Sequence, residues 1–138
     1  EGAGAGRYRG GFGAVRELEI LADEAITYAS FGRSIEPPWG LKGGAPGSCN
    51  FMQIESGGET LRVARIPYHA LKPGDRVRIV TGGGGGYGNA FERPAEEVLE
   101  DLRNDYITPD TARDEYGVAL TPDGMVDTAA TESLRAGR

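Results

Sequence analysis

The sequence of 138 residues has almost none of the side chains that build disulfides and metal centres. It holds one cysteine, Cys49, and one histidine, His69. A single cysteine excludes an intramolecular disulfide and a cysteine-based zinc site, and one histidine excludes a histidine-rich metal site. We therefore expect a reducing, cytoplasmic compartment and no metal site built by this chain alone. We expect His69 to be a hydrogen-bonded structural residue and Cys49 a buried small side chain.

Long apolar runs and signal-peptide features are also missing. No run approaches the roughly 18 apolar residues of a membrane-spanning helix. The glycine-rich first residues lack a basic stretch followed by an apolar one, which a signal peptide requires. We therefore expect neither a signal peptide nor a membrane partner.

Up to Gly88 the sequence favours β-strands, because apolar and polar residues alternate in several short stretches. These stretches cover residues 15–20, 25–31, 51–54, 61–66 and 76–80. The turn residues Asp23 and Glu24 separate the first two, so we predict that these two pair as an antiparallel hairpin. A loop rich in proline and glycine follows at residues 34–50. A loop of this length usually has a function, forms an interface or packs on a larger body.

After Gly88 the apolar period changes from 2 to 3.6, which predicts helices. The first helix begins at Pro94 and has an apolar face and an acidic face. The apolar face comprises Val98, Leu99 and Leu102, and the acidic, solvent-facing one comprises Glu96, Glu97, Glu100 and Asp101. A second helix has Thr108 as its N-cap and Gly117 at its C-terminal end, and Asp127 caps a third.

Basic residues are scarce in the last third of the chain. Residues 1–88 carry 10 basic and 9 acidic side chains, whereas residues 89–138 carry 5 basic and 12 acidic ones. Charge and apolar period change at the same boundary. We therefore predict an α+β fold, with a mainly antiparallel β portion over residues 1–88 and a C-terminal acidic helical tail over residues 89–138. An acidic chain binds phosphate backbones poorly, so nucleic acid is not an expected partner.

Five consecutive glycines after the last predicted strand are the first candidate site. The 23 glycines of the chain have no three-residue period, which excludes collagen. A run of this kind permits a crowded backbone crossing, where no side chain fits, or a close approach to a substrate. A phosphate cradle is the weaker alternative, because no Lys followed by Ser or Thr completes a P-loop. The candidate residues are Gly82, Gly83, Gly84, Gly85, Gly86 and the following Tyr87.

Arg7, Arg9 and Trp39 are the other candidates, on the substrate side of a site or at an interface. The two arginines flank Tyr8. Guanidinium groups bind carboxylates or phosphates through paired hydrogen bonds, and interface ion pairs are the alternative that we favour. Trp39 follows two prolines and is either a packing anchor or an interface hot spot. The residues do not make a complete catalytic constellation, so no catalytic residue is predicted.

Five motifs in a fixed order resemble the C-terminal end of the hydantoinase B/oxoprolinase family, which includes N-methylhydantoinase B subunits, 5-oxoprolinase and related ketone carboxylase subunits. The similarity extends from Gly4 to about Leu134. The motifs are Gly4-Ala5-Gly6-Arg7-Tyr8-Arg9-Gly10-Gly11, then Pro38-Trp39-Gly40-Leu41 with Gly43-Gly44 and Pro46-Gly47, Leu71-Lys72-Pro73-Gly74-Asp75, Thr81-Gly82-Gly83-Gly84-Gly85-Gly86-Tyr87-Gly88, and Arg113-Asp114-Glu115-Tyr116-Gly117-Val118.

The resemblance implies a piece of a larger, multi-chain, cytoplasmic enzyme. Family members act with an actin-like hydantoinase A-type partner, which uses ATP to phosphorylate a lactam, hydantoin or ketone oxygen. The B part then completes ring hydrolysis or, in the carboxylase branch, carboxylation. The family's metal ligands lie in its N-terminal portion, which this chain does not match. The resemblance thus implies that ATP, Mg²⁺ and a divalent metal bind elsewhere in the complex and no cofactor binds this chain.

The expected function is that of a C-terminal piece of an ATP-dependent cyclic-amide hydrolase, inactive by itself. The expected partners are the rest of the hydantoinase B-type subunit, the hydantoinase A-type subunit and a small cyclic amide. Two alternatives stay open. One is a piece of an ATP-dependent ketone carboxylase subunit of the acetone or acetophenone type, and the other is a non-catalytic binding or scaffold module.

Overall fold

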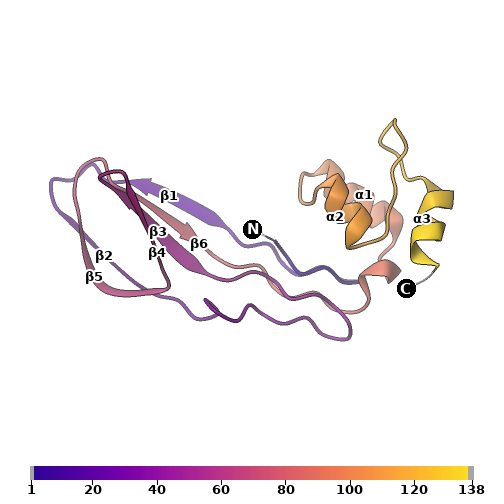
Figure 1. The fold of residues 1–138 in the computed structure, drawn as a ribbon, viewed down its shortest axis with the longest axis horizontal. Helices are drawn as coiled ribbons and strands as arrows, with labels where there is room; N and C mark the ends of the chain where they lie inside the picture. The colour runs from indigo at the N-terminus through magenta and orange to yellow at the C-terminus, as the bar shows by residue number, and fades with distance from the viewer. Residues whose placement is uncertain (1, 137–138) are drawn as a thin grey trace.

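The computed structural model describes residues 2–136 and has an elongated shape. Six strands lie at one end and the helices at the other, and long extended segments connect the two ends (Figure 1). Each end has its own apolar core. The predicted α+β fold is confirmed.

Antiparallel strands form two sheets of unequal size. Four strands pair in the order β1-β6-β3-β4, and two pair in the order β2-β5. The strands are β1 (Val15–Glu19), β2 (Ala25–Ser30), β3 (Phe51–Ser56), β4 (Glu59–Val63), β5 (Arg65–Leu71) and β6 (Arg76–Val80). The smaller sheet packs on the apolar face of the larger one. The buried residues between them are Ala29, Met52, Ile54, Leu71 and Val77.

The predicted hairpin of the first two strands is wrong. β1 pairs with β6 and β2 pairs with β5, so the first two strands belong to different sheets. The pairing of β1 continues past its end, because the backbone of Ile20 bonds to Gly74 and Asp75. Opposite charges also face each other across this pair, as Glu17 and Arg78 do, and such pairs favour a register.

The strand predicted over residues 61–66 is interrupted at Ala64. β4 ends just before this residue in the larger sheet, and β5 begins just after it in the smaller sheet. The carbonyl of Ala64 accepts the N–H of Phe31 at 2.8 Å. Val63 and Ala64 are consecutive apolar residues, so the alternation shifts phase at this corner, a signal that the prediction of one continuous strand overlooked.

The helical end has a short 3-10 turn and three α-helices. They are η1 (Ala90–Glu92), α1 (Ala95–Arg103), α2 (Pro109–Asp114) and α3 (Thr128–Arg135). The predicted N-caps are confirmed, because Thr108 and Asp127 accept N–H groups of the first turns of α2 and α3. Gly117 has the left-handed φ of 62° that a helix C-terminus requires. None of the described helices is long and apolar enough to cross a membrane.

Candidate functional site

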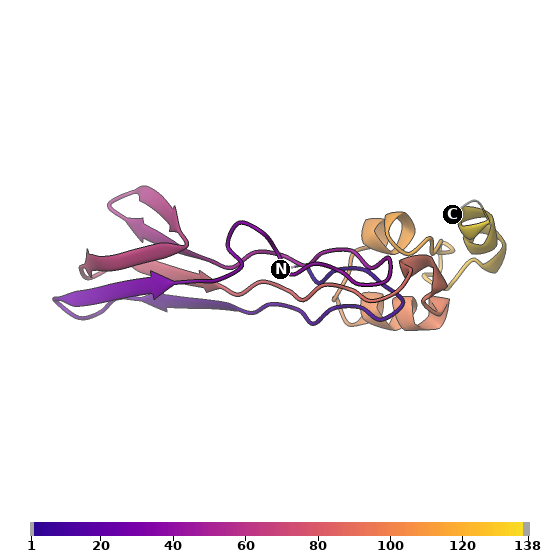
Figure 2. The same cartoon turned by 90° about the horizontal axis from the view of Figure 1, so that it is seen from below.

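Three glycine-rich segments run side by side between the two ends of the molecule (Figures 1 and 2). The first segment comprises residues 2–13, the second residues 38–48 and the third residues 81–88, and we call them together the glycine bundle. Backbone hydrogen bonds join them outside the sheets. The N–H of Gly86 donates to the carbonyl of Ala45 at 2.9 Å, and the N–H of Ala45 donates to that of Ala5 at 2.7 Å.

In the third segment, residues three positions apart face the same neighbouring segment. A side chain at Gly82 or Gly85 would overlap the backbone of the second segment. One at Gly83 or Gly86 would overlap the backbone of the first segment. Three residues per turn is the geometry of a polyproline II helix. The structure therefore contains one of the alternatives given for the glycine run, a crowded crossing of backbones where no side chain fits.

Four of the five N–H groups of the glycine run donate hydrogen bonds within the chain. The N–H of Gly82 donates to Oδ1 of Asn50 at 2.7 Å, and that of Gly83 to Oγ of Ser48 at 2.9 Å. The N–H groups of Gly84, Gly86, Tyr87 and Gly88 donate to backbone carbonyls of the bundle. A phosphate cradle needs several free N–H groups, so these residues do not fit a nucleotide phosphate.

A row of three large side chains crosses the helical end of the bundle. Tyr87 is the backbone partner of Tyr8 on one side and of Leu41 on the other. Directly opposite residues present their side chains on the same face, and the two tyrosine rings lie 6.3 Å apart. All three side chains are exposed. We call Tyr8, Tyr87 and Leu41 the aromatic row, because two of its three members are tyrosines.

Arg7 and Trp39 lie on the surface of the bundle. The guanidinium of Arg7 lies 5.9 Å from the centre of the Tyr8 ring and 3.6 Å from the carboxylate of Glu92. Trp39 is 63% exposed, with the guanidinium of Arg33 4.3 Å above its ring. Trp39 is therefore not a buried anchor within the described residues, and its ring is free to contact a partner.

We expected Arg9 to form an ion pair at an interface, but it forms one within the chain. Its Nε and Nη2 donate to the two oxygens of Asp101 at 3.0 and 3.1 Å. Asp101 is only 5% exposed, although it was predicted on the solvent face of the first helix. Arg93 also donates to Asp101, at 3.1 Å. This ion pair joins the glycine bundle to α1.

The sequence contained one signal for the burial of Asp101. Asp101 lies three positions after the fully buried Val98, and residues three apart share a helix face. Arg93 was missed altogether. It is 9% exposed, and its Nη1 donates to the carbonyl of Arg7 at 3.3 Å. Tyr116 lies in the same apolar core as Val98, and burial raises the pKa of its hydroxyl group.

His69 lies half-buried on the inner face of β5, opposite Thr27 of β2. It lines a cavity of about 550 Å³ between the sheets, together with Lys72 and Asp75. The expected hydrogen bond of His69 is not formed by any residue that the structure describes. Cys49 is half-buried, and its Sγ lies 3.5 Å from the carbonyl of Ile35.

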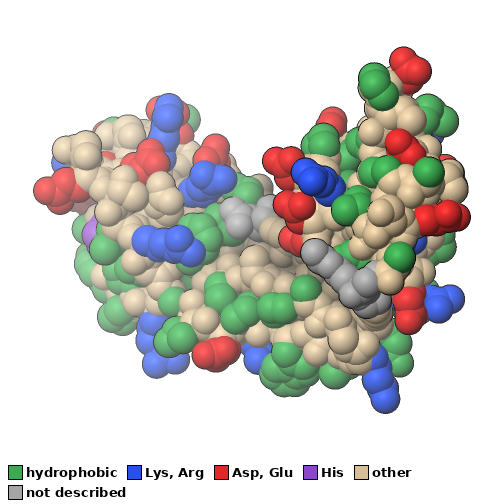
Figure 3. Space-filling view, turned by 45° about the vertical axis from the view of Figure 1, so that its right-hand side comes forward, with side chains coloured by type: hydrophobic (Ala, Val, Ile, Leu, Met, Phe, Trp, Pro, Cys, Tyr) green, Lys and Arg blue, Asp and Glu red, His purple; other side chains and the backbone are tan. Residues whose placement is uncertain are grey.

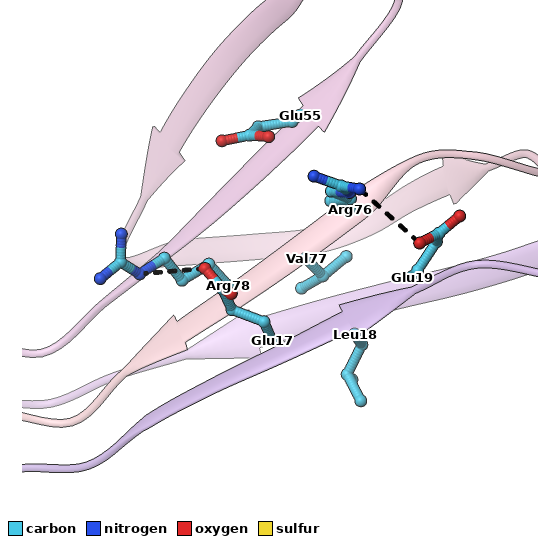
Figure 4. A pocket seen from close by; sticks show the side chains of 7 residues that line it. All are labelled: Glu17, Leu18, Glu19, Glu55, Arg76, Val77 and Arg78. Carbon is cyan, nitrogen blue, oxygen red and sulfur yellow. Dashed lines mark ion pairs between the residues drawn. The ribbon is translucent and has the colours of Figure 1, made fainter.

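A second cavity, of about 450 Å³, lies on the polar face of the larger sheet (Figure 4). Arg78 lies 3.6 Å from Glu17 and Arg76 lies 3.8 Å from Glu19 in ion pairs between exposed side chains. Oε1 of Glu55 accepts an N–H of Gln53 at 3.0 Å. Such exposed pairs contribute little to stability. Positive and negative side chains pair across the strands, so this face resembles an ordinary solvent-exposed surface.

In the part of the chain that the structure describes, potential ligand side chains are not grouped around a site for a metal ion. Among residues 2–136 no group of three or more His, Cys, Asp or Glu side chains is placed to hold one. The space-filling view shows a hollow between the two ends of the molecule (Figure 3). The candidate site is therefore a surface, formed by the aromatic row, Arg7 and Trp39.

Comparison with known proteins gives consistent matches. A sequence model of the family described as Hydantoinase B/oxoprolinase matches residues 1–90. The beta subunit of the caprolactamase of Pseudomonas jessenii is 37% identical over 142 residues, covering 99% of this chain and 24% of that protein. A putative D-/L-hydantoinase B subunit of Pseudomonas sp. (strain NS671) is 34% identical over 133 residues, covering 94% and 22%.

Solved structures have the same fold. The crystal structure of the ATP-dependent caprolactamase from Pseudomonas jessenii matches with a TM-score of 0.78 and 34% identity, over 96% of this chain and 24% of that one. A nucleotide-free acetone carboxylase matches with a TM-score of 0.76 and 22% identity, over 97% and 23%. The second likeness shows the fold alone. The chain spans about a quarter of the length of these relatives.

Proposed function

Since the chain belongs to the hydantoinase B/oxoprolinase family, we propose that it is the C-terminal piece of a B-type subunit in an ATP-dependent amidohydrolase. This enzyme opens a lactam or hydantoin ring. One observation carries the proposal: nearly the whole chain aligns with a caprolactamase subunit, at 37% identity, and makes up about a quarter of it.

In this proposal the chain supplies structure and an interface rather than chemistry. An actin-like A-type partner binds ATP with Mg²⁺ and phosphorylates the carbonyl oxygen of the cyclic amide, which turns a poor electrophile into a good one. The divalent metal and its ligands belong to the rest of the B-type subunit. One observation supports this division: four of the five N–H groups of the glycine run donate hydrogen bonds within the chain.

The surface of the β end supports a place inside a larger body. All five residues of β1 are exposed, on both faces of the strand. Val15 and Leu18 lie on opposite faces and are 44% and 39% exposed. An edge strand with uncovered apolar side chains invites pairing and packing. The aromatic row and Trp39 add tyrosine and tryptophan, which are typical of interface hot spots.

Native mass spectrometry of the purified particle, with a denatured mass for every chain in it, tests the proposal. We expect a large complex that contains an actin-like ATPase and the rest of the B-type subunit. A lone species of about 15 kDa, the mass of this chain, that stays folded would overturn the proposal. It would instead favour the non-catalytic binding module.

A ketone carboxylase, which the resemblance of the sequence left open, is the second candidate reaction, and acetone carboxylase has the same fold. ATP turnover by the whole complex separates the two reactions. We expect caprolactam or a hydantoin to stimulate ATP hydrolysis without added bicarbonate. Turnover that requires both a ketone and bicarbonate would replace the hydrolase with the carboxylase.

A further inference from the structure

The two-stranded sheet β2-β5 has apolar side chains on both of its faces. Its inner face packs on the larger sheet through Ala29 and Leu71. On the outer face Ile26 lies opposite Ala70, and the ribbon lies at the β end of the molecule (Figures 1 and 2). A sheet with one face in water normally alternates apolar and polar residues. The apolar side chains on the outer face of this ribbon depart from that pattern.

The outer face is strongly exposed in the described chain. Ile26 is 61% exposed, Tyr28 79% and Tyr68 62%, and Ala70 is exposed beside them. We call Ile26, Tyr28, Tyr68 and Ala70 the outer ribbon face. No charged side chain belongs to this set. Single exposed apolar residues are ordinary, but neighbouring large ones mark an interaction site.

We infer that the rest of the B-type subunit packs on the outer ribbon face, as a permanent contact that completes the β end. The inference rests on the proposed function. Relatives that match nearly the whole chain are about four times its length, so a body large enough to cover this face belongs to the same subunit.

The chemistry of the face favours this occupant over a transient partner. Permanent interfaces are more apolar than transient ones, and charged residues are depleted from interface cores. The four residues of the face carry no charge, and the charged Arg65 lies beyond them, opposite Ser30. Buried tyrosines keep a hydrogen bond for their hydroxyl groups. The covering surface therefore has apolar side chains opposite Ile26 and polar groups within reach of the hydroxyls of Tyr28 and Tyr68.

Two matched substitutions test the inference. The tagged chain is co-expressed with the rest of the B-type subunit from the same genome, and their affinity is measured after purification. Ile26→Asp puts a charge into the contact, so we expect binding to weaken at least about 30-fold, as for a hot-spot residue. Ile35→Asp changes the same residue type at a loop position that is 87% exposed, and we expect no change in affinity.

Footprinting of the wild-type chain by hydroxyl radicals gives a readout that needs no substitution. We expect Tyr28 and Tyr68 to be oxidised in the free chain and protected in the assembled subunit. Equal oxidation in both states would overturn the inference, as would binding that Ile26→Asp leaves unchanged. A dimer of this chain that Ile26→Asp disrupts would assign the face to a second copy instead. Failure of the wild-type chain to bind any B-type companion would count against the proposed function itself.

Discussion

At the scale of single residues, the glycine bundle depends on the absence of side chains at a few close approaches. A Cβ at Gly86 would overlap the carbonyl of Ala5, which belongs to the fixed backbone of the first segment. Backbone cannot move aside as a flexible side chain can. Glycine is thus required at this position for space, and its φ is not in the left-handed region.

We expect Gly86→Ala to lower the free energy of unfolding by about 2–3 kcal/mol, the cost of overfilling a packed site. Urea unfolding of the purified protein measures the change. Gly11→Ala is the matched control, because a Cβ there meets no atom within 4 Å. We expect the control to change stability by less than about 0.5 kcal/mol. Equal effects of the two substitutions would contradict the steric account.

Asp101 is the second residue on which the molecule depends, because its buried carboxylate forms ion pairs with both Arg9 and Arg93. Asp101→Asn removes the countercharge of Arg9 and leaves Arg93 with only the exposed Glu97, 3.4 Å away, so we expect a loss of about 3 kcal/mol in the free energy of unfolding. Glu17→Gln breaks an exposed ion pair with Arg78 and should cost less than about 1 kcal/mol. Chemical unfolding of both variants measures the two losses. A loss from Asp101→Asn no larger than that of the control would show that the buried pair is not a structural centre.

At the scale of elements, the turn between β5 and β6 is closed by one carboxylate. The buried Asp75 accepts the backbone N–H of Lys72 at 3.0 Å. This hydrogen bond is the largest cause that holds the pKa of Asp75 below its ordinary value of 3.8. A carboxyl with a depressed pKa in the folded state stabilises the fold above its unfolded pKa. Its contribution is lost as pH falls through the lower, folded pKa.

We therefore expect the stability difference between wild type and Asp75→Asn to be constant near neutral pH and to shrink as pH falls below about 4. Chemical unfolding curves at a series of pH values measure it. A difference that stays the same down to the acid limit would show that the ionised carboxylate is not what closes the turn. Glu59→Gln, an exposed residue of β4 near the same cavity, serves as the control.

At the scale of the whole molecule, two separate cores are connected by the glycine bundle, whose segments approach one another at glycines. Large exposed side chains lie on the surface of the bundle. One of them is Trp39, which is 63% exposed. We expect Trp39→Ala to leave the stability of the chain unchanged within about 0.5 kcal/mol. In the assembled particle it should weaken association by about 2–4 kcal/mol. Titration followed by native mass spectrometry measures this, and unchanged assembly would remove Trp39 from the interface.

The sequence by itself determined the features that depend on neighbours along the chain. Period-2 alternation located β1, β2, β3 and β6 but merged β4 with the start of β5, and cap residues such as Thr108 and Asp127 fixed the starts of α2 and α3. The resemblance of five ordered motifs identified the family. These signals are local, because a hydrogen bond from a cap or an alternation of faces involves only residues a few positions apart.

Only the tertiary structure decided which distant segments meet. Alternation tells which face of a strand is apolar but not which strand lies beside it, so the hairpin of β1 and β2 was predicted wrongly. The burial of Asp101 depends on Arg9, which lies far away in the sequence and pairs with it at 3.0 Å. The need for glycine in the five-residue run likewise comes from the tertiary structure, because the backbones of the first and second segments of the bundle occupy the space that side chains would fill.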